Sequence, residues 1–168
     1  MSSDDAATVP RPTRITAVPG GPHIDVVRDF DAPPERVFAA HCDPALFSQW
    51  IGPARLITVV EHMDARTGGS YRFVQREHDG GEYRFRGSFH EVAAPHRIVM
   101  TFEYEGAPGH VELDTASFSD LPDGRCRLRV HSTFESAKER DAVLAAGMAD
   151  GVEEGYRRLD GLLADGIA

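Results

Sequence analysis

Three side chains of this sequence could carry general acid–base chemistry, namely Glu91, Tyr83 and His62. A carboxyl, phenol or imidazole group can move a proton to or from a bound substrate, and a polycyclic or enolisable substrate would suit such groups. All three lie in strand-like runs, where an isolated polar side chain needs no catalytic role. We therefore treat them as weak candidates, and the pattern favours binding over catalysis.

Motifs for other chemistries are absent from the sequence. The eight histidines show neither HxH nor HExxH spacing, so we expect no metal site. Neither a GxxxxGKS/T phosphate loop nor a GxSxG nucleophile motif occurs. Cys42 and Cys126 lack CxxC spacing, which argues against a zinc site or a disulfide framework and favours a reducing cytoplasm. We also expect no cofactor.

Four polar side chains lie in phase with the apolar side of their predicted strands, namely Arg28, Gln75, Glu91 and Ser132. An unpaired charge in a dry core is strongly unfavourable. The interpretation that we favour places Arg28 and Glu91 at strand ends, paired with each other or with solvent. The alternative makes the four groups part of a cavity wall, where they orient the carbonyl or hydroxyl group of a ligand.

Alternating apolar and polar side chains predict the sheet that positions these groups. Tyr83, Phe85 and Phe89 face one side of their run and the arginines between them face the other, which is typical of a strand with one dry face. Asp79-Gly80 and Asp123-Gly124 are hairpin signals, so neighbouring strands should pair antiparallel. The expected strands are His23–Asp31, Leu56–Asp64, Gly69–His78, Glu82–Val92, Arg97–Glu105, His110–Ser119 and Arg125–Phe134.

Two short helices are expected between the first and second strands. The first covers Glu35–His41, with its acidic residue at the positive end of the helix. Asp43 is a good N-cap for the second, which Gly52-Pro53 ends. Trp50, the only tryptophan, lies on the apolar side of this second helix. It is either a plug of the core or a movable gate over a cavity.

A long C-terminal helix is expected to cover the dry face of the sheet. Ser136 begins a capping-box pattern, and a helix continuing to about Ala164 would be about 40 Å long at 1.5 Å per residue. Gly147, Gly151 and Gly155 recur on one side of it. They allow either a close approach of helix to sheet, which we favour, or room for a ligand beneath the helix. The apolar stripe comprises Leu144, Met148, Val152, Tyr156, Leu159 and Leu163.

Length and charge restrict the class of protein. A chain of 168 residues fits one domain, which we expect over residues 23–165, after a disordered tail over 1–22 with one extended stretch near Arg14–Val18. A net charge of −9 argues against nucleic acid as a partner. No apolar run is long enough for membrane insertion, and no secretory signal precedes the domain. The single lysine among 18 basic residues suggests a GC-rich bacterial genome.

Four segments resemble one known family. They are "RDFDAPPERVFAAHCDPALFSQWIGP" (Arg28–Pro53), "DARTGGSYRF" (Asp64–Phe73), "GSFHEVAAPHRIVMTF" (Gly87–Phe102) and "GMADGVEEGYRRLDGLLA" (Gly147–Ala164). They are similar to the activator-of-heat-shock-protein-90-ATPase-homologue-like family, within the START-like (SRPBCC, birch-pollen-allergen-like) superfamily. The resemblance covers about residues 23–165. It implies an α+β helix-grip fold, in which a curved antiparallel sheet of about seven strands wraps around the long C-terminal helix.

The resemblance implies a function in binding. The superfamily includes lipid carriers, cyclases, stress-response proteins and co-chaperone modules, and fold alone does not decide among them. We expect a monomer or weak dimer that binds a small hydrophobic ligand (a lipid, polyketide or other apolar metabolite) between sheet and C-terminal helix. The expected cavity residues are Phe47, Trp50, Tyr71, Phe73, Gln75, Tyr83, Phe85, Phe89, Met100, Phe102, Leu128, Val130, Leu144, Met148, Val152 and Tyr156.

Two alternatives stay open. An aromatase/cyclase-like enzyme would need Glu91 or Tyr83 inside the cavity. A protein-interaction module would instead stimulate the ATPase of a chaperone partner, as the family name implies. Bacterial relatives often carry a second aromatic residue after the tryptophan and a Gly-Trp pair in the last helix. Ile51 and Val152 stand at those positions here, so the cavity should be wider or differently shaped than in those relatives.

Overall fold

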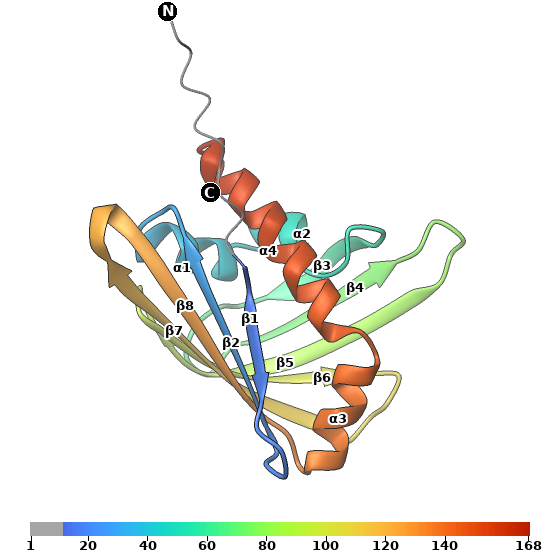
Figure 1. Cartoon of the computed structure of the whole chain (residues 1–168). Coiled ribbons are helices and arrows are strands. Elements are labelled where there is room, and N and C mark those ends of the chain that lie inside the picture. The colour runs from blue at the N-terminus through green and yellow to red at the C-terminus, as the bar shows by residue number, and fades with distance from the viewer. Residues whose placement is uncertain (1–11) are drawn as a thin grey trace, which may run out of the picture.

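Hairpin connections join most of the strands into one curved antiparallel sheet. The structure, a computed structural model, describes residues 12–168. Its eight strands follow the order β1-β2-β8-β7-β6-β5-β4-β3 across the sheet, and Figure 1 shows the sheet bending around α4. The strands are β1 (Arg14–Ala17), β2 (His23–Phe30), β3 (Ile57–Met63), β4 (Ser70–Arg76), β5 (Glu82–Ala93), β6 (Arg97–Tyr104), β7 (Val111–Leu121) and β8 (Arg125–Thr133). This confirms the predicted α+β helix-grip fold and all seven predicted strands.

The eighth strand is β1, which lies in the segment expected to be a disordered tail. Arg14 pairs with Val27 and Ala17 with Ile24, so this stretch forms the edge of the sheet beside β2. The pairing satisfies backbone groups of β2 that would otherwise stay open at an edge. The extended stretch expected near Arg14–Val18 is therefore this strand. Residues 1–11 of the expected tail lie outside the described part of the chain.

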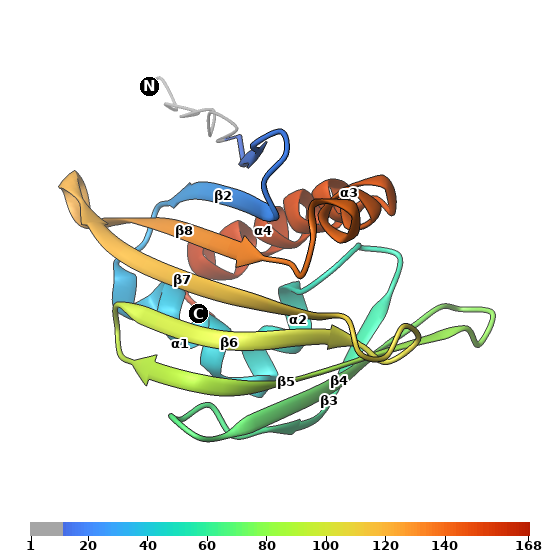
Figure 2. The same cartoon turned by 90° about the horizontal axis from the view of Figure 1, so that it is seen from below.

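The two short helices form as predicted, as α1 (Pro34–Cys42) and α2 (Pro44–Trp50). The Asp43 carboxylate accepts hydrogen bonds from the backbone N–H groups of Ala45, at 2.8 Å, and Leu46, at 3.4 Å. It therefore caps α2 by satisfying two of the N–H groups that a helix start leaves without partners. Figure 2 shows the sheet curving around the space that α1, α2 and the C-terminal helices occupy.

The predicted single C-terminal helix is instead two helices, α3 (Ala137–Ala145) and α4 (Met148–Ala164). Ser136 caps α3 as expected, because its hydroxyl accepts from the Glu139 N–H at 3.1 Å. Gly147 adopts φ 90°, in the left-handed region that a residue with a side chain rarely enters, and this ends α3. With 17 residues α4 is about 25 Å long, so it covers less of the sheet than a continuous helix would.

The fully packed part of the core lies at the α1 end of the sheet. Phe30, Phe118, Leu128 and Leu159 are buried there, between strands, α1 and α4. The Phe38 ring meets the Phe118 ring edge-on at 5.2 Å. The packed core therefore closes one end of the space between the sheet and the helices.

Among the described residues, none of the helices has the length and apolar character that a membrane span requires.

Candidate functional site

Trp50 closes the α2 end of that space. Its indole is only 4% exposed, and its Nε1–H donates to the Ala40 carbonyl oxygen at 2.9 Å. The ring stacks on Tyr156 at 5.9 Å and lies 4.7 Å from the His41 ring. Burial lowers the pKa of His41 to about 4, so the neighbouring imidazole is neutral at pH 7. Trp50 is thus a plug of the core in this structure, held by a hydrogen bond and by ring contacts.

The glycines of α4 let the helix approach the α2–β3 loop. A Cβ atom on Gly151 would lie 3.5 Å from Pro53, and one on Gly155 would lie 2.9 Å from the Trp50 carbonyl oxygen. Arg158 then donates to the carbonyl oxygens of Trp50, at 3.0 Å, Ile51 and Gly52. The favoured close-approach interpretation is correct for Gly155, with the loop rather than the sheet as the surface approached, whereas a Cβ atom on Gly151 would make only an ordinary van der Waals contact. Gly147 has the different role of ending α3.

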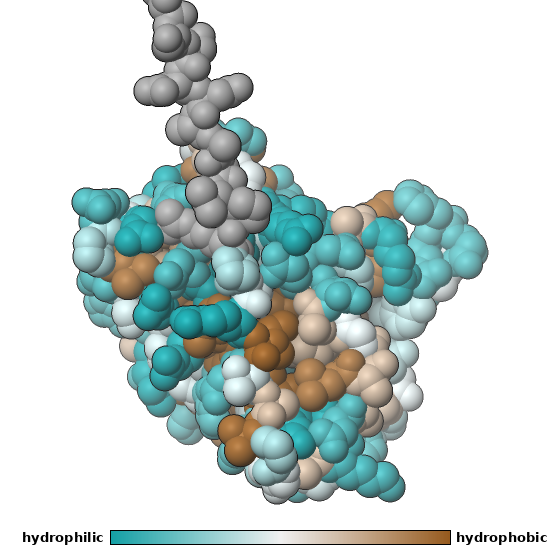
Figure 3. Space-filling view, in the orientation of Figure 1, coloured by the Kyte–Doolittle hydropathy of each residue, from teal (hydrophilic) through white to brown (hydrophobic). Residues whose placement is uncertain are grey.

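The predicted cavity residues divide into two groups by burial. Eight are buried and extend the packed core, namely Phe47, Trp50, Tyr71, Phe73, Gln75, Phe89, Leu128 and Tyr156. Eight are only half-buried, namely Tyr83, Phe85, Met100, Phe102, Val130, Leu144, Met148 and Val152, and all of these except Tyr83 pack against the core. Figure 3 shows apolar atoms gathered at the surface where α3 meets α4. The concave face is therefore closed at one end and partly open at the other.

An aromatic wall lines the open end. Phe85 stacks on Phe102 at 5.2 Å and on Phe73 at 5.1 Å, and its ring lies 5.3 Å from that of Tyr104. These residues come from β4, β5 and β6, where the strand register brings inward-facing positions side by side. Gln75 also points inward and donates weakly, at 3.4 Å each, to the Ile51 carbonyl and the Thr58 hydroxyl. The wall offers flat apolar surface with few polar groups.

Two acidic residues on the same concave face, Glu112 and Asp114, were not among the predicted site residues. Glu112 and Asp114 lie on β7 in phase with the buried Ala116 and Phe118, and Asp114 is itself buried. Ser132 on β8, which was singled out, donates to the Asp114 carboxylate at 2.5 Å. The period-two pattern of "VELDTASF" would have revealed both acids, because each stands two residues from an inward position.

Burial controls the charge of this acid pair. It raises the pKa of Glu112 to about 9, and the nearby Asp114 carboxylate raises it further in the same direction. The pKa of Asp114 is also raised by burial, against the opposing effect of hydrogen bonds from Ser132 and Glu112. Glu112 therefore keeps its proton at neutral pH, and the interior holds a carboxylic acid that can donate a hydrogen bond.

Arg28 is paired with a different residue from the one expected. Its guanidinium is 2% exposed and bonds to the Asp160 carboxylate of α4 at 2.5 Å, not to Glu91. It also lies 5.3 Å from the centre of the Phe30 ring. Within the described chain, Nε and one terminal nitrogen of Arg28 have no hydrogen-bond partner. This ion pair holds α4 against β2.

The three acid–base candidates do not meet in the interior. A β-bulge between Phe89 and Glu91 reverses the side-chain phase, so Glu91 pairs with Val99 on the outer face and lies 3.4 Å from Arg97. The expected inward position of Glu91 is therefore wrong. A second bulge precedes His62, which contacts the Ser70 hydroxyl at 2.8 Å. The Tyr83 hydroxyl donates to Glu77 at 2.7 Å.

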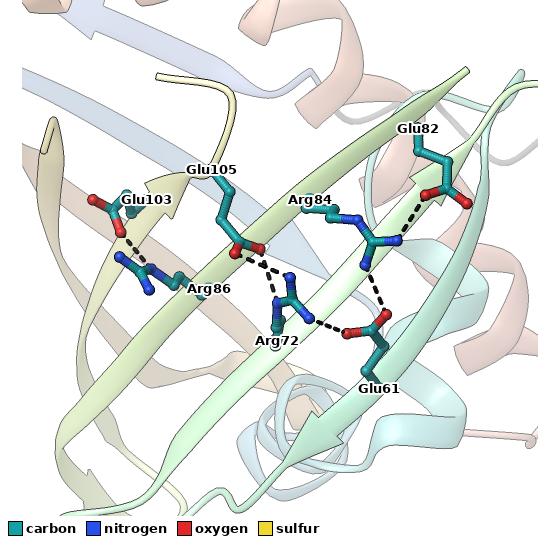
Figure 4. A network of polar contacts seen from close by, with 7 residues as sticks. All are labelled: Glu61, Arg72, Glu82, Arg84, Arg86, Glu103 and Glu105. Carbon is teal, nitrogen blue, oxygen red and sulfur yellow. Dashed lines mark hydrogen bonds and ion pairs between the residues drawn. The ribbon is translucent and has the colours of Figure 1, made fainter. Parts of the chain in front are cut away.

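Several charged side chains on the outer face of the sheet are paired with one another. Arg72 bonds to Glu105 at 2.9 Å and to Glu61 at 2.8 Å, and Arg86 bonds to Glu103 at 2.6 Å, as Figure 4 shows. A hollow of about 390 Å³ lies on this face, lined mainly by polar residues such as Ser88. It opens on the opposite side of the sheet from the aromatic wall, and of the predicted cavity residues Tyr71 alone is among those that line it.

One cluster of metal-ligating side chains also lies outside the concave site. The ligand atoms of His110, Glu135 and Glu139 lie within 4.8 Å of one another at the surface. His110 already contacts Glu139 at 2.7 Å, which accounts for their proximity without an ion. We assign no metal to these residues.

Comparisons with known proteins agree with this fold. The sequence model of one family, described as "Activator of Hsp90 ATPase homolog 1-like protein", matches residues 31–164. A crystal structure from Rhodobacter sphaeroides is 28% identical, covers 91% of this chain and 98% of its own, and gives a TM-score of 0.82. A solution structure from Arthrobacter aurescens is 25% identical, with 90% and 91% covered and a TM-score of 0.83. No curated protein matches.

Proposed function

Because this chain belongs to the family of Activator of Hsp90 ATPase homolog 1-like proteins, we propose that it binds a small hydrophobic molecule. The molecule lies on the concave side of the sheet, between the aromatic wall of β4, β5 and β6 and the junction of α3 and α4. One observation carries the proposal: the apolar side chains at this end stay half-buried, whereas those at the α1 end are buried.

The energetics of burial support this proposal. Removing apolar surface from water stabilises a protein by about 25 cal/mol per Å², so a concave face that stays partly exposed forgoes that gain. Phe85, Phe102 and Met148 are large apolar side chains that stay partly exposed on this face, and all three pack against the buried core. A ligand of matching shape would cover them, and pockets of this type are concave, largely apolar and supplied with a few polar groups.

The break at Gly147 gives a structural reason for the opening. A continuous helix would run on across the sheet, but α3 and α4 change direction where Gly147 takes φ 90°. Leu144 and Met148 flank this break and stay half-buried. The opening is therefore a consequence of local backbone conformation rather than of missing apolar residues.

A methyl-detected NMR titration tests the proposal. Fatty acids, flavonoids and small polyketides serve as probes, because they represent the apolar ligand classes that the proposal includes. We expect the methyl signals of Leu144, Met148 and Val152 to shift together, while those of the buried Val37 and Leu159 move little. Shifts confined to outer-face methyls such as Val59, or no shift with any probe, would refute the proposal.

The two alternatives have less support. The enzyme alternative used Glu91 or Tyr83 inside the cavity, but Glu91 faces outward and the Tyr83 hydroxyl bonds to Glu77. The interaction alternative rests on the family description, and an ATPase assay with a chaperone from the same organism distinguishes it, since ligand binding alone predicts no stimulation.

A further inference from the structure

Polar side chains from four elements converge at the inner end of the open site. Glu112 and Asp114 come from β7, Ser132 from β8, Tyr71 from β4 and Tyr156 from α4. Ser132 donates to Asp114 at 2.5 Å. The charges of Asp114 and Glu112 act on the Tyr71 hydroxyl, and that of Asp114 acts on Tyr156. The five groups therefore form one electrostatically connected cluster inside an apolar interior.

The Tyr156 side chain is only 6% exposed, and within residues 12–168 no side-chain hydrogen bond involves its hydroxyl. A largely buried hydroxyl without a protein partner can bond to a water molecule or to a ligand. Tyr71 differs, because its hydroxyl donates to the Thr101 carbonyl at 2.5 Å. Tyr156 thus presents a free polar atom on the side of the interior where the acid pair lies.

The acid pair also has no cationic partner. In the part of the chain that the structure describes, no ion pair involves Glu112 or Asp114, and the one basic group whose charge acts on Asp114 is His131. His131 is itself paired with Asp25 at 2.9 Å. Arg28, one of two buried arginines, is paired with Asp160, although its charge also acts on the Tyr156 hydroxyl. Asp114 is buried and Glu112 half-buried, and a carboxyl pair in such a place without a cation is unusual, because buried acids are normally paired.

Aromatic rings stand next to the pair. Phe102 is the direct register partner of Glu112, and Met100 is that of Asp114. Phe85 stacks on Phe102 at 5.2 Å, so two ring faces lie beside the acid. Ring faces carry negative electrostatic potential and attract cations, most strongly where water is excluded.

We propose that this site recognises an organic amine, with the apolar body on Phe85, Phe102 and Met100 and the ammonium group against Glu112, Asp114 and the Tyr156 hydroxyl. This rests on the proposed function and specifies the chemistry of its ligand. A ligand carboxylate would be repelled by the same groups. A neutral alcohol could bond to the cluster but would leave the acid pair without a counter-charge.

The pH dependence of the binding affinity distinguishes an amine from a neutral ligand. Free Glu112 holds a proton at neutral pH, whereas a bound ammonium favours its carboxylate form, so binding should release a proton. The affinity for an amine that stays protonated should therefore rise between about pH 6.5 and about pH 8.5. If Glu112 instead donated to a neutral ligand oxygen, affinity would fall over the same range.

Calorimetry with three matched probes tests this: 4-phenylbutylamine, 4-phenylbutan-1-ol and 4-phenylbutyrate. We expect the amine to bind about tenfold or more tightly than the alcohol, and the butyrate to bind most weakly. Glu112→Gln should remove about tenfold of the amine affinity and leave the alcohol nearly unchanged. Glu105→Gln, which removes an outer-face carboxylate, is the control and should change neither.

The outcomes separate the two proposals. If the alcohol equals or exceeds the amine, if amine affinity falls with rising pH, or if Glu112→Gln leaves the amine preference intact, the amine assignment is wrong while binding of hydrophobic molecules stands. If none of the three probes shifts the Leu144, Met148 or Val152 methyl signals, the amine assignment is wrong, and both proposals are overturned if the fatty acids, flavonoids and polyketides shift none of them either. Thermal unfolding of each variant checks that it is folded.

Discussion

A Cβ atom on Gly155 would lie 2.9 Å from the carbonyl oxygen of Trp50, closer than real Cβ contacts come to a backbone oxygen. At this contact α4 packs directly against the end of α2. Three successive carbonyl groups that begin at Trp50 also accept hydrogen bonds from Arg158. The seating of α4 therefore depends on the absence of one side chain.

Gly155→Ala should lower the free energy of unfolding by about 1–3 kcal/mol, because helix or loop must shift to relieve the overlap. Alanine would otherwise favour a helix by about 0.5–1 kcal/mol over glycine. Gly161→Ala, where the new Cβ meets nothing within 4 Å, is the matched control and should stabilise the protein. Urea unfolding measures both, and a neutral Gly155→Ala would contradict the close approach.

Asp160→Asn should be costly because it leaves the buried Arg28 charge without its partner. Breaking a buried ion pair typically costs about 3–5 kcal/mol, and the partial exposure of Asp160, 41%, reduces the expected loss to about 1–3 kcal/mol. Asp64→Asn is the comparison, since Asp64 is equally exposed, at 42%, but pairs with Arg66, which is 70% exposed. That change should cost about 0–1 kcal/mol. Equal losses for the two variants would argue against a stabilising role of the Arg28 pair.

Val152→Trp should fill part of the opening between α4 and the aromatic wall. Val152 is half-buried and contacts the core, so an indole at this position would compete with a bound ligand. We expect affinity for a hydrophobic probe to fall by about tenfold or more while the protein stays folded. Val59→Trp adds the same side chain at an exposed position of the outer face and should leave affinity unchanged. Unaltered binding by Val152→Trp would exclude this opening as the binding site.

Glu112 should make the protein less stable as the pH rises. In the folded state it holds its proton up to about pH 9, whereas in the unfolded state it loses it near the usual value of 4.5. Between these values the folded state binds more protons, so the free energy of unfolding falls with rising pH. Glu112→Gln removes this dependence and should exceed the wild type in stability by about 1–3 kcal/mol near pH 8.5, and by little near pH 5.

A matched variant separates this effect from general charge removal. The pKa of Glu105 is lowered, chiefly by its hydrogen bond from Arg72, so Glu105 is ionised in both states above about pH 5.5. The stability difference between Glu105→Gln and the wild type should therefore be constant from about pH 5.5 to about pH 8.5. A flat difference for Glu112→Gln as well would show that Glu112 is not protonated in the folded interior.

Much of the fold could be predicted because its signals are local. Period-two alternation identified the strands, and the turn residues at Asp79-Gly80 and Asp123-Gly124 joined them. Asp43 and Ser136 marked helix starts correctly, because a cap depends only on backbone groups two or three residues away. The candidate site was harder to predict from the sequence, because cavity residues and core residues follow the same apolar pattern.

The sequence by itself determined which residues form strands and helices, and which side of most strands is apolar. Only the tertiary structure decided that a bulge turns Glu91 outward, that Gly147 divides the last helix, and that Arg28 pairs with Asp160. It also decided that Glu112 keeps a proton. The physical reason is that register shifts, burial and electrostatic surroundings depend on segments far apart in the chain, and no local pattern records which distant groups will meet.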